Sequence, residues 1–217
     1  MNDLCALIDR KVNELTNPTP NPDPAIAPWA QQITSVVRRA QAFEGVLIAH
    51  AIPGLLASAP HLNVVAQPRI CLPQRALEAI AEGVEDIALE YTEDGSAHRR
   101  LDFAVFDARS GALEFVECKR GLHQIGADHQ RARLNDDAVL ELIGRSYARK
   151  KFRQIAMYCR CLTVSYYGNT GLPEHRTLRA PELDAHYGWP VRDQVEQTLT
   201  RFRTRLDQAI PGLTGAT

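Results

Sequence analysis

The sequence lacks the features of membrane proteins and of disulfide-stabilised proteins. No apolar run approaches the roughly 18 residues that a helix needs to cross a bilayer, and the acid-containing N-terminal stretch 1–15 does not resemble a secretory signal. Cysteines are few: there are five, an odd number, and their spacing forms no disulfide framework. We therefore expect a soluble, cytoplasmic protein that makes no membrane contact.

Motifs of several large enzyme classes are also absent. The chain has no P-loop motif, no GxGxxG and no GxSxG, which argues against a P-loop NTPase, a dinucleotide-binding enzyme and an α/β-hydrolase. A zinc site normally needs four ligands, and nothing completes one around the closely spaced Cys159 and Cys161. On a strand their sulfurs would face the same side, and we interpret them as small buried side chains.

The overall composition is that of an ordinary globular chain. With 217 residues, 45% of them hydrophobic and 24% charged, the chain can form one domain with appendages. The net charge of −1 does not indicate a polyanionic partner. However, no acid occurs between Glu141 and Glu174, where six basic residues fall. Such local basic groups can bind phosphates, although the run at 145–153 alone is equally typical of a solvated helix end.

Prolines divide the chain near its beginning. Residues 2–16 predict a short helix, and the next twelve residues contain five prolines, which excludes a helix or a central strand there. We therefore expect residues 1–27 to be an N-terminal helix and linker, residues 28–170 to be the core, and residues 171–217 to be a loop and a C-terminal helix that packs on the core.

Hydrophobic periodicity predicts alternating helices and strands after the linker. The predicted helices are 29–50, 74–82, 136–151 and 191–210, and the predicted strands are 62–72, 85–92, 101–106, 113–119 and 154–167. Pro53 predicts a break after the first helix, Pro68 predicts a bend in the first strand, and Asn135 is a good N-cap for the third helix. This order predicts an α/β fold with a central mixed β-sheet flanked by helices.

The strands 101–106 and 113–119 form the clearest local signal. A short loop with Gly111 joins them, as in a β-hairpin. If the loop is 107–112, the register pairs Phe106 with Leu113, Ala104 with Phe115 and Asp102 with Glu117. Side chains alternate along a strand, so one face would be apolar near the turn and would carry Asp, Glu and Lys at its open end.

Carboxylates this close repel each other, and a divalent cation removes that penalty. Asp102 and Glu117 offer the oxygen ligands that suit Mg²⁺ or Mn²⁺. Lys119 lies two residues beyond Glu117 and points to the same side. It could orient an attacking water and offset charge on phosphorus. The pattern therefore predicts hydrolysis of a phosphodiester.

This arrangement resembles the PD-(D/E)xK nuclease superfamily. The matching residues are Asp102 and the run Glu117-Cys118-Lys119 on consecutive antiparallel strands. The resemblance implies a restriction-endonuclease-like core with the element order αβββαβ, and it covers about residues 29–167. The residue before Asp102 is Leu101 rather than the proline of the family pattern, a position that the family often relaxes.

The resemblance also implies a role for each residue of the site. Asp102, Glu117 and the carbonyl of Cys118 would bind Mg²⁺ or Mn²⁺, and Lys119 would serve the attacking water. Many members add a Glu from the first core helix, and Glu44 fits that place on the apolar stripe of the helix 29–50. The implied function is a Mg²⁺-dependent nuclease, with DNA as the expected substrate.

Basic residues around this region are the expected contacts to the nucleic acid backbone. They are Arg99, Arg100, Arg120, Arg145, Arg149, Lys150 and Lys151.

Other interpretations remain open. Glu117 and Lys119 are also compatible with an ordinary surface ion pair that has Asp102 as a cross-strand partner. A helix-rim glutamate is ordinary too, and other acids could take the third role; these are Glu78, Glu85 and Glu90. The main alternative function is a non-catalytic nucleic-acid-binding or assembly module that retains the nuclease fold. A homodimer joined through the amphipathic helix 191–210 is a further alternative.

Overall fold

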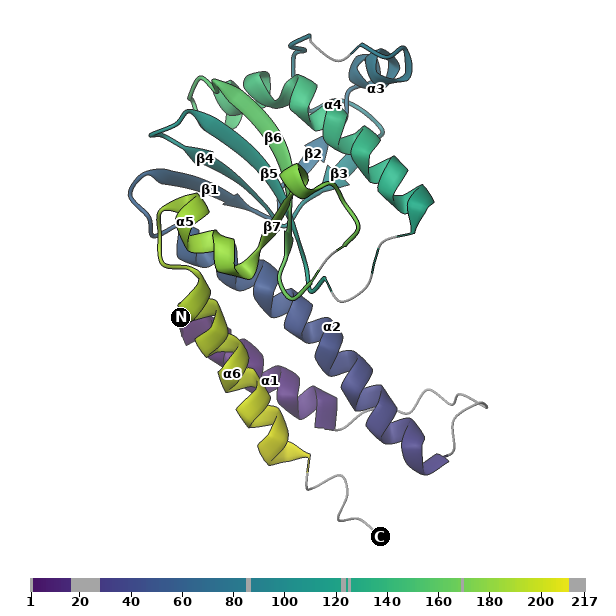
Figure 1. The fold of residues 1–217 in the computed structure, drawn as a ribbon, viewed down its shortest axis with the longest axis vertical. Coiled ribbons are helices and arrows are strands. Elements are labelled where there is room, and N and C mark those ends of the chain that lie inside the picture. Colours follow the sequence, from purple (N-terminus) through teal and green to yellow (C-terminus); the bar gives the residue numbers. More distant parts are fainter. Residues whose placement is uncertain are drawn as a thin grey trace. The chain divides into compact units, whose positions relative to one another are not determined.

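The computed structural model describes residues 2–16, 28–84, 87–121, 124, 126–168 and 170–210. The chain divides into two compact units (Figure 1). One contains Met1–Ala51 and Asp193–Thr217 and is called the helical unit below; the other contains Ile52–Arg192 and is called the sheet unit. This division groups the C-terminal helix with the N-terminal one, whereas the sequence predicts that the C-terminal helix packs on the core.

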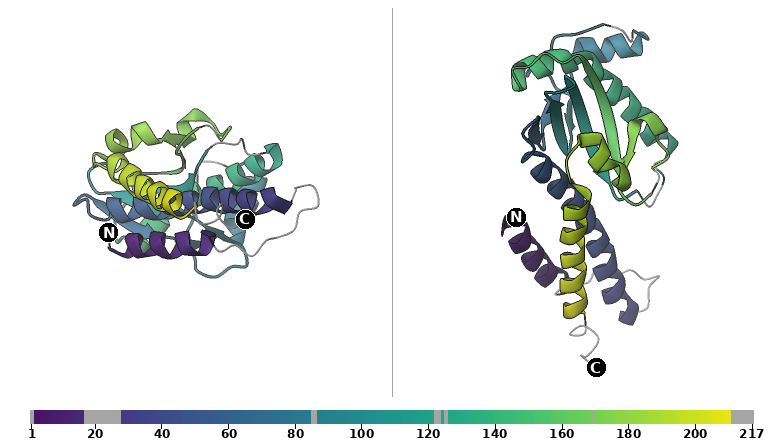
Figure 2. Two further views of the ribbon diagram at one scale, coloured as in Figure 1. Left: turned by 90° about the horizontal axis from the view of Figure 1, so that it is seen from below. Right: turned by 60° about the vertical axis from the view of Figure 1, so that its left-hand side comes forward.

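Three helices form the helical unit: α1 (Asn2–Thr16), most of α2 (Pro28–Leu56) and α6 (Arg192–Ala209). Figure 2 shows them side by side. Their inward positions are apolar and buried, as expected of amphipathic helices. The rings of Phe43 and Phe202 meet edge to face, with centroids 5.2 Å apart. Both terminal helices are thus confirmed, while the proline-rich linker lies outside the described residues.

Helix α2 continues past the break that was predicted at Pro53. A proline inside a helix removes one backbone hydrogen bond. Here Ile52 and Leu56 are completely buried, and the Ala57 N–H still donates to the Pro53 carbonyl at 3.0 Å. Burial of the apolar neighbours outweighs the lost bond, and the predicted end of the helix before Pro53 is therefore wrong.

A five-stranded mixed sheet forms the centre of the sheet unit (Figure 1). In spatial order its strands are β1 (Leu62–Ala66), β4 (Phe103–Asp107), β5 (Ala112–Lys119), β6 (Tyr158–Ser165) and β7 (Thr177–Arg179). The pairings β1–β4 and β4–β5 are antiparallel, and the pairings β5–β6 and β6–β7 are parallel. A parallel step needs a crossover, which helix α4 (Ala127–Lys151) supplies between β5 and β6. The expected mixed sheet with flanking helices is confirmed.

The β4–β5 hairpin has the register that the sequence predicted near its turn. Phe106 pairs with Leu113, and Ala104 pairs with Phe115. All four side chains belong to a buried cluster that includes residues of α4. The Phe115 ring meets Tyr147 of α4 edge to face, with centroids 5.3 Å apart. This face of the hairpin is therefore the core face.

The strand predicted at 62–72 is two strands in two sheets. The backbone turns at Gln67, which has a φ of 49°, and the predicted bend at Pro68 is confirmed. Strand β2 (Arg69–Cys71) then pairs with β3 (His98–Arg100) in a separate two-stranded sheet. Helix α3 (Gln74–Ala81) follows β2, close to its predicted limits.

The strand predicted at 85–92 is wrong over its described part, because residues 87–92 have no strand conformation. The Leu89 N–H donates to the carbonyl of Leu142 at 3.0 Å. The Tyr91 carbonyl accepts from Lys150 Nζ at 2.6 Å. Both partners lie on α4, so polar groups of this segment bond to the helix and not to a neighbouring strand.

Helix α4 begins at Ala127, well before the predicted start at residue 136. Its first turns contain mostly good helix formers, such as Ala, Arg, Gln and Leu. The predicted N-cap Asn135 therefore lies inside the helix. This correction matters for the site, because it adds two helical turns next to the open end of the hairpin.

The remaining elements follow β6. They are two short 3₁₀ segments (Glu174–Arg176 and Ala180–Glu182) and helix α5 (Leu183–Tyr187). Among the helices of the described ranges, none is both long enough and apolar enough to cross a membrane.

Candidate metal centre at the open end of the hairpin

Asp102 lies directly before β4, at the point where the hairpin opens. Its N–H donates to the carbonyl of Val116 at 3.1 Å, and its carboxylate oxygen Oδ2 accepts from the Cys118 N–H at 2.6 Å. The Asp102 carboxylate is thereby held against the β5 backbone, beside the residue that follows Glu117. The β4–β5 register begins at the pair Phe103–Val116, so Asp102 lies just outside the ladder and its predicted pairing with Glu117 is not part of it.

The Glu117 carboxylate is surrounded by three cations. Arg99 of β3 donates to Oε2 at 2.7 Å, and Arg133 of α4 binds the same oxygen. Lys119, two residues along β5, pairs with Oε1. The structure therefore joins Glu117 and Lys119 as the sequence predicted, and it adds two arginines from other elements.

The charge state of Glu117 follows from these contacts. Burial disfavours the ionised carboxylate, but the charges of Arg133 and Lys119, the Lys119 hydrogen bond and the charge of Arg99 outweigh it. The pKa of Glu117 is therefore lowered, and the group is an anion at neutral pH.

Two aspartates of α4 complete the surroundings. Arg99 Nη1 donates to Asp136 Oδ2 at 2.9 Å, and Arg133 Nε lies 3.7 Å from Asp137 Oδ2. Sequence reasoning missed Arg133 and both aspartates as parts of the site. Arg133 and Asp137 lie on the same helical face as the buried Leu140, at spacings of four and three residues, but their charge hides them from a search for apolar periodicity.

The oxygen groups near this end of the hairpin are of the chemical type that binds a hard divalent cation. Asp102 and Glu117 supply carboxylates, and Cys118 supplies a backbone carbonyl between Glu117 and Lys119. Mg²⁺ is often held by one or two carboxylates, with water and substrate phosphates as further ligands. Within the described residues no group of three or more His, Cys, Asp or Glu side chains is placed to hold a metal ion. The described residues therefore form no all-protein cage, and a metal ion at Asp102 and Glu117 would need water or substrate as its further ligands.

No relative was found. Comparison with models of known protein families gave no match, and neither did comparison with curated proteins or with solved structures. The interpretation of the site therefore depends on its geometry and on the sequence pattern.

Glu44, the expected third carboxylate, belongs to the helical unit. It is buried, and Arg203 of α6 donates to its Oε1 at 2.7 Å. An acid on an apolar stripe needs a partner, and Arg203 is one. Of the other acids considered, Glu78 accepts from Gln74 on the surface of α3, Glu90 is described below, and Glu85 lies outside the described residues.

The predicted nucleic acid contacts do not form one patch around the site. Arg99 reaches Glu117, as described. The four basic residues of α4 lie 12 to 18 positions beyond Arg133, about 18–27 Å at 1.5 Å per residue. They contact groups near that end of the helix: Arg145 the Met157 carbonyl, Arg149 the Glu90 carboxylate, Lys150 the Tyr91 carbonyl and Lys151 the Glu93 carboxylate.

The last two predicted contacts lie at β3 and after β5. Arg100 donates to Gln67 Oε1 at 3.1 Å. The Arg120 guanidinium lies 5.7 Å from the centre of the Tyr167 ring.

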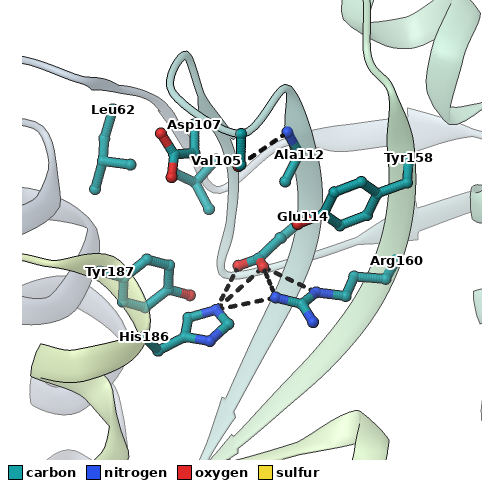
Figure 3. Close-up of a pocket in the computed structure, with 10 residues that line it drawn as sticks. Leu62, Val105, Asp107, Ala112, Glu114, Tyr158, Arg160, His186 and Tyr187 are labelled. Atoms are coloured by element: carbon teal, nitrogen blue, oxygen red, sulfur yellow. Dashed lines mark hydrogen bonds and ion pairs between the residues drawn. The ribbon is translucent and has the colours of Figure 1, made fainter.

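A second polar cluster lies on the opposite face of the sheet (Figure 3). Glu114 of β5 is buried between Arg160 of β6, its registered neighbour, and His186 of α5. His186 Nε2 lies 3.1 Å from each carboxylate oxygen of Glu114. The cluster lines a cavity of about 160 Å³ with Tyr187 and Asp107. These contacts join α5 to the sheet, and we interpret them as structural.

The Glu114 cluster predicts an acid-sensitive stability. Burial opposes ionisation of Glu114, but the hydrogen bond and charge of His186 and the charge of Arg160 lower its pKa below 4.5. Its stabilisation is therefore present above about pH 4.5 and is lost as the pH falls through the folded-state pKa. Glu114→Gln should lower the free energy of unfolding by about 2 kcal/mol at pH 7, and this difference should shrink below pH 4.5.

Urea denaturation of both proteins between pH 3 and pH 7 measures this difference. Glu90→Gln, which removes an exposed ion pair with Arg149, is the control and should have the smaller effect. A Glu114→Gln difference that does not change with pH would contradict the assignment.

Proposed function

We propose that this protein is a Mg²⁺- or Mn²⁺-dependent nuclease of the PD-(D/E)xK type, acting on DNA. The observation that supports this most directly is that Asp102 and the ion pair of Glu117 and Lys119 lie at the open end of one hairpin. The Asp102 carboxylate accepts a hydrogen bond from the N–H of Cys118, the residue after Glu117. The Lys119 ammonium forms an ion pair with the Glu117 carboxylate.

The order of elements is a second support. Helix α2, the antiparallel strands β1, β4 and β5, the crossover helix α4 and the parallel strand β6 follow one another along the chain. A restriction-endonuclease-like core with the order αβββαβ has this sequence of elements. The small sheet of β2 and β3 and helix α3 would then be insertions between β1 and β4.

The proposed chemistry is the in-line attack of water on the phosphorus of a phosphodiester. A new P–O bond forms while the P–O bond to the opposite sugar oxygen breaks, and that oxygen leaves as a protonated hydroxyl. A divalent cation would activate the water and neutralise charge on the phosphate oxygens. Asp102, Glu117 and the Cys118 carbonyl would hold this ion. The Lys119 ammonium, held beside Glu117, would orient the water and offset the negative charge that develops on phosphorus.

Cleavage assays on the full chain test the proposal. We expect cleavage of DNA with Mg²⁺ or Mn²⁺ and loss of cleavage when EDTA removes the ion. Asp102→Asn should be inactive because it removes one ligand charge. Absence of cleavage of both DNA and RNA with either ion would refute the proposal.

One observation favours a second candidate, a metal-free nucleic-acid-binding module. Glu117 already has three cationic partners, Arg99, Arg133 and Lys119, so its charge is balanced without a metal. Binding of labelled DNA with and without Mg²⁺ distinguishes the two candidates, since the module should bind equally well in EDTA.

A further inference from the structure

Each of the two arginines at Glu117 also faces an aspartate of α4. Arg99 bridges Glu117 on β5 and Asp136 on α4, with N–O distances of 2.7 and 2.9 Å. Arg133 binds Glu117 with Nη1, while its Nε lies 3.7 Å from Asp137 Oδ2. The two arginines thus lie between Glu117, which is a proposed metal ligand, and the two aspartates of α4, which are not.

The Arg133–Asp137 couple is incompletely bonded. Both side chains are buried, at 6% and 5% exposure. Within the described part of the chain, Arg133 Nε and Asp137 Oδ1 have no hydrogen-bond partner. Buried polar atoms without partners are costly. Rotation of the Arg133 guanidinium away from Glu117 and toward Asp137 would give both atoms a hydrogen-bond partner.

We infer that Arg133 and Arg99 compete with the divalent cation for Glu117, and that Asp137 and Asp136 accept these arginines when the ion binds. This inference rests on the proposed metal-dependent function. The two arginine–aspartate couples would then set the metal affinity of the site, and Arg133 and Asp137 would be positioning residues for the ligand Glu117.

Removal of the arginine and removal of the aspartate of one couple should change the metal affinity in opposite directions. A guanidinium on Glu117 Oε2 repels an incoming cation and occupies a ligand oxygen, so its removal strengthens metal binding. The Asp137 carboxylate draws the guanidinium away from Glu117, so its removal weakens metal binding. A purely structural role predicts that both substitutions act in the same direction.

Calorimetric titration of Mn²⁺ into the full chain, without nucleic acid, tests the inference. Arg133→Gln should tighten Mn²⁺ binding and Asp137→Asn should weaken it, each by about tenfold, which lies within the usual range of coupling between sites. Arg149→Gln is the matched control, because it removes an arginine of the same helix whose ion pair with Glu90 is remote from Glu117; it should leave the affinity unchanged.

The possible outcomes separate this inference from the proposed function. If the wild-type chain binds no Mn²⁺, both are refuted. If the wild type binds Mn²⁺ but both variants match it, or both weaken it, only the competition is refuted. Circular dichroism checks folding, and if the buried couple does not tolerate substitution, Arg99→Gln and Asp136→Asn repeat the test at the more exposed couple with the same expected signs.

Discussion

Lys119→Ala should lower the rate of DNA cleavage by about 10²–10³-fold, the effect expected when one preorganised group that stabilises transition-state charge is removed. Lys119 is at the end of β5, its side chain is 44% exposed, and it contacts Glu117. The substitution removes no buried apolar contact, so the free energy of unfolding should change little. A gel assay of initial rates at saturating Mg²⁺ measures the loss.

Lys11→Ala is a matched control for this experiment. Lys11 is 36% exposed and ion-paired with Glu14 at 2.7 Å, and it belongs to α1 of the helical unit, to which no part of the proposed site is assigned. Its removal should leave cleavage unchanged. If both variants lost activity equally, the effect would reflect general charge at the surface, and equal activity of Lys119→Ala and the wild type would remove Lys119 from the mechanism.

The hairpin was predictable because its determinants are local. Alternation of apolar residues defined which side chains share a face, and the short loop with Gly111 fixed the register. The pairs Phe106–Leu113 and Ala104–Phe115 follow from these two facts alone. The same reasoning joined Glu117 to Lys119, since residues two apart on a strand point to one side.

The α4 contribution to the site was not predictable in the same way. Asn135 followed by two aspartates is a strong local signal for a helix start, and it concealed the helical turns before it. Once the helix begins at Ala127, Arg133 and Asp137 fall on its buried face. Periodicity identifies buried faces by apolar residues, so charged residues on such a face become visible only when their partners are known.

Short strands and contacts between distant segments account for the other differences between the predicted and the observed structure. The strands β3 and β7 have three residues each, too few for an alternating pattern to be recognised. Glu44 illustrates the same limit. An acid on an apolar stripe needs a partner, but the sequence does not show which one, because Arg203 is 159 residues further along the chain.

Phe115→Ala should give the largest loss of stability among these substitutions, about 3–5 kcal/mol, because it removes a large side chain from a close-packed core and leaves a cavity. Phe115 is 1% exposed and packs edge to face on Tyr147 of α4. A methyl group added to Gly144 would lie 3.4 Å from its ring, so α4 and β5 are already close together there.

Urea denaturation at pH 7 measures this loss, and Ile155→Ala provides the contrast. Ile155 is also a large apolar residue, but it is 78% exposed, so its truncation should cost far less. The Phe115 effect should also reach the site, because Glu117 follows two residues later on the same face, and Arg133 reaches it from α4. If Phe115→Ala were as mild as Ile155→Ala, β5 would not pack on α4 through this face. The helix that brings Arg133 and Asp137 to Glu117 would then have no fixed position beside the hairpin.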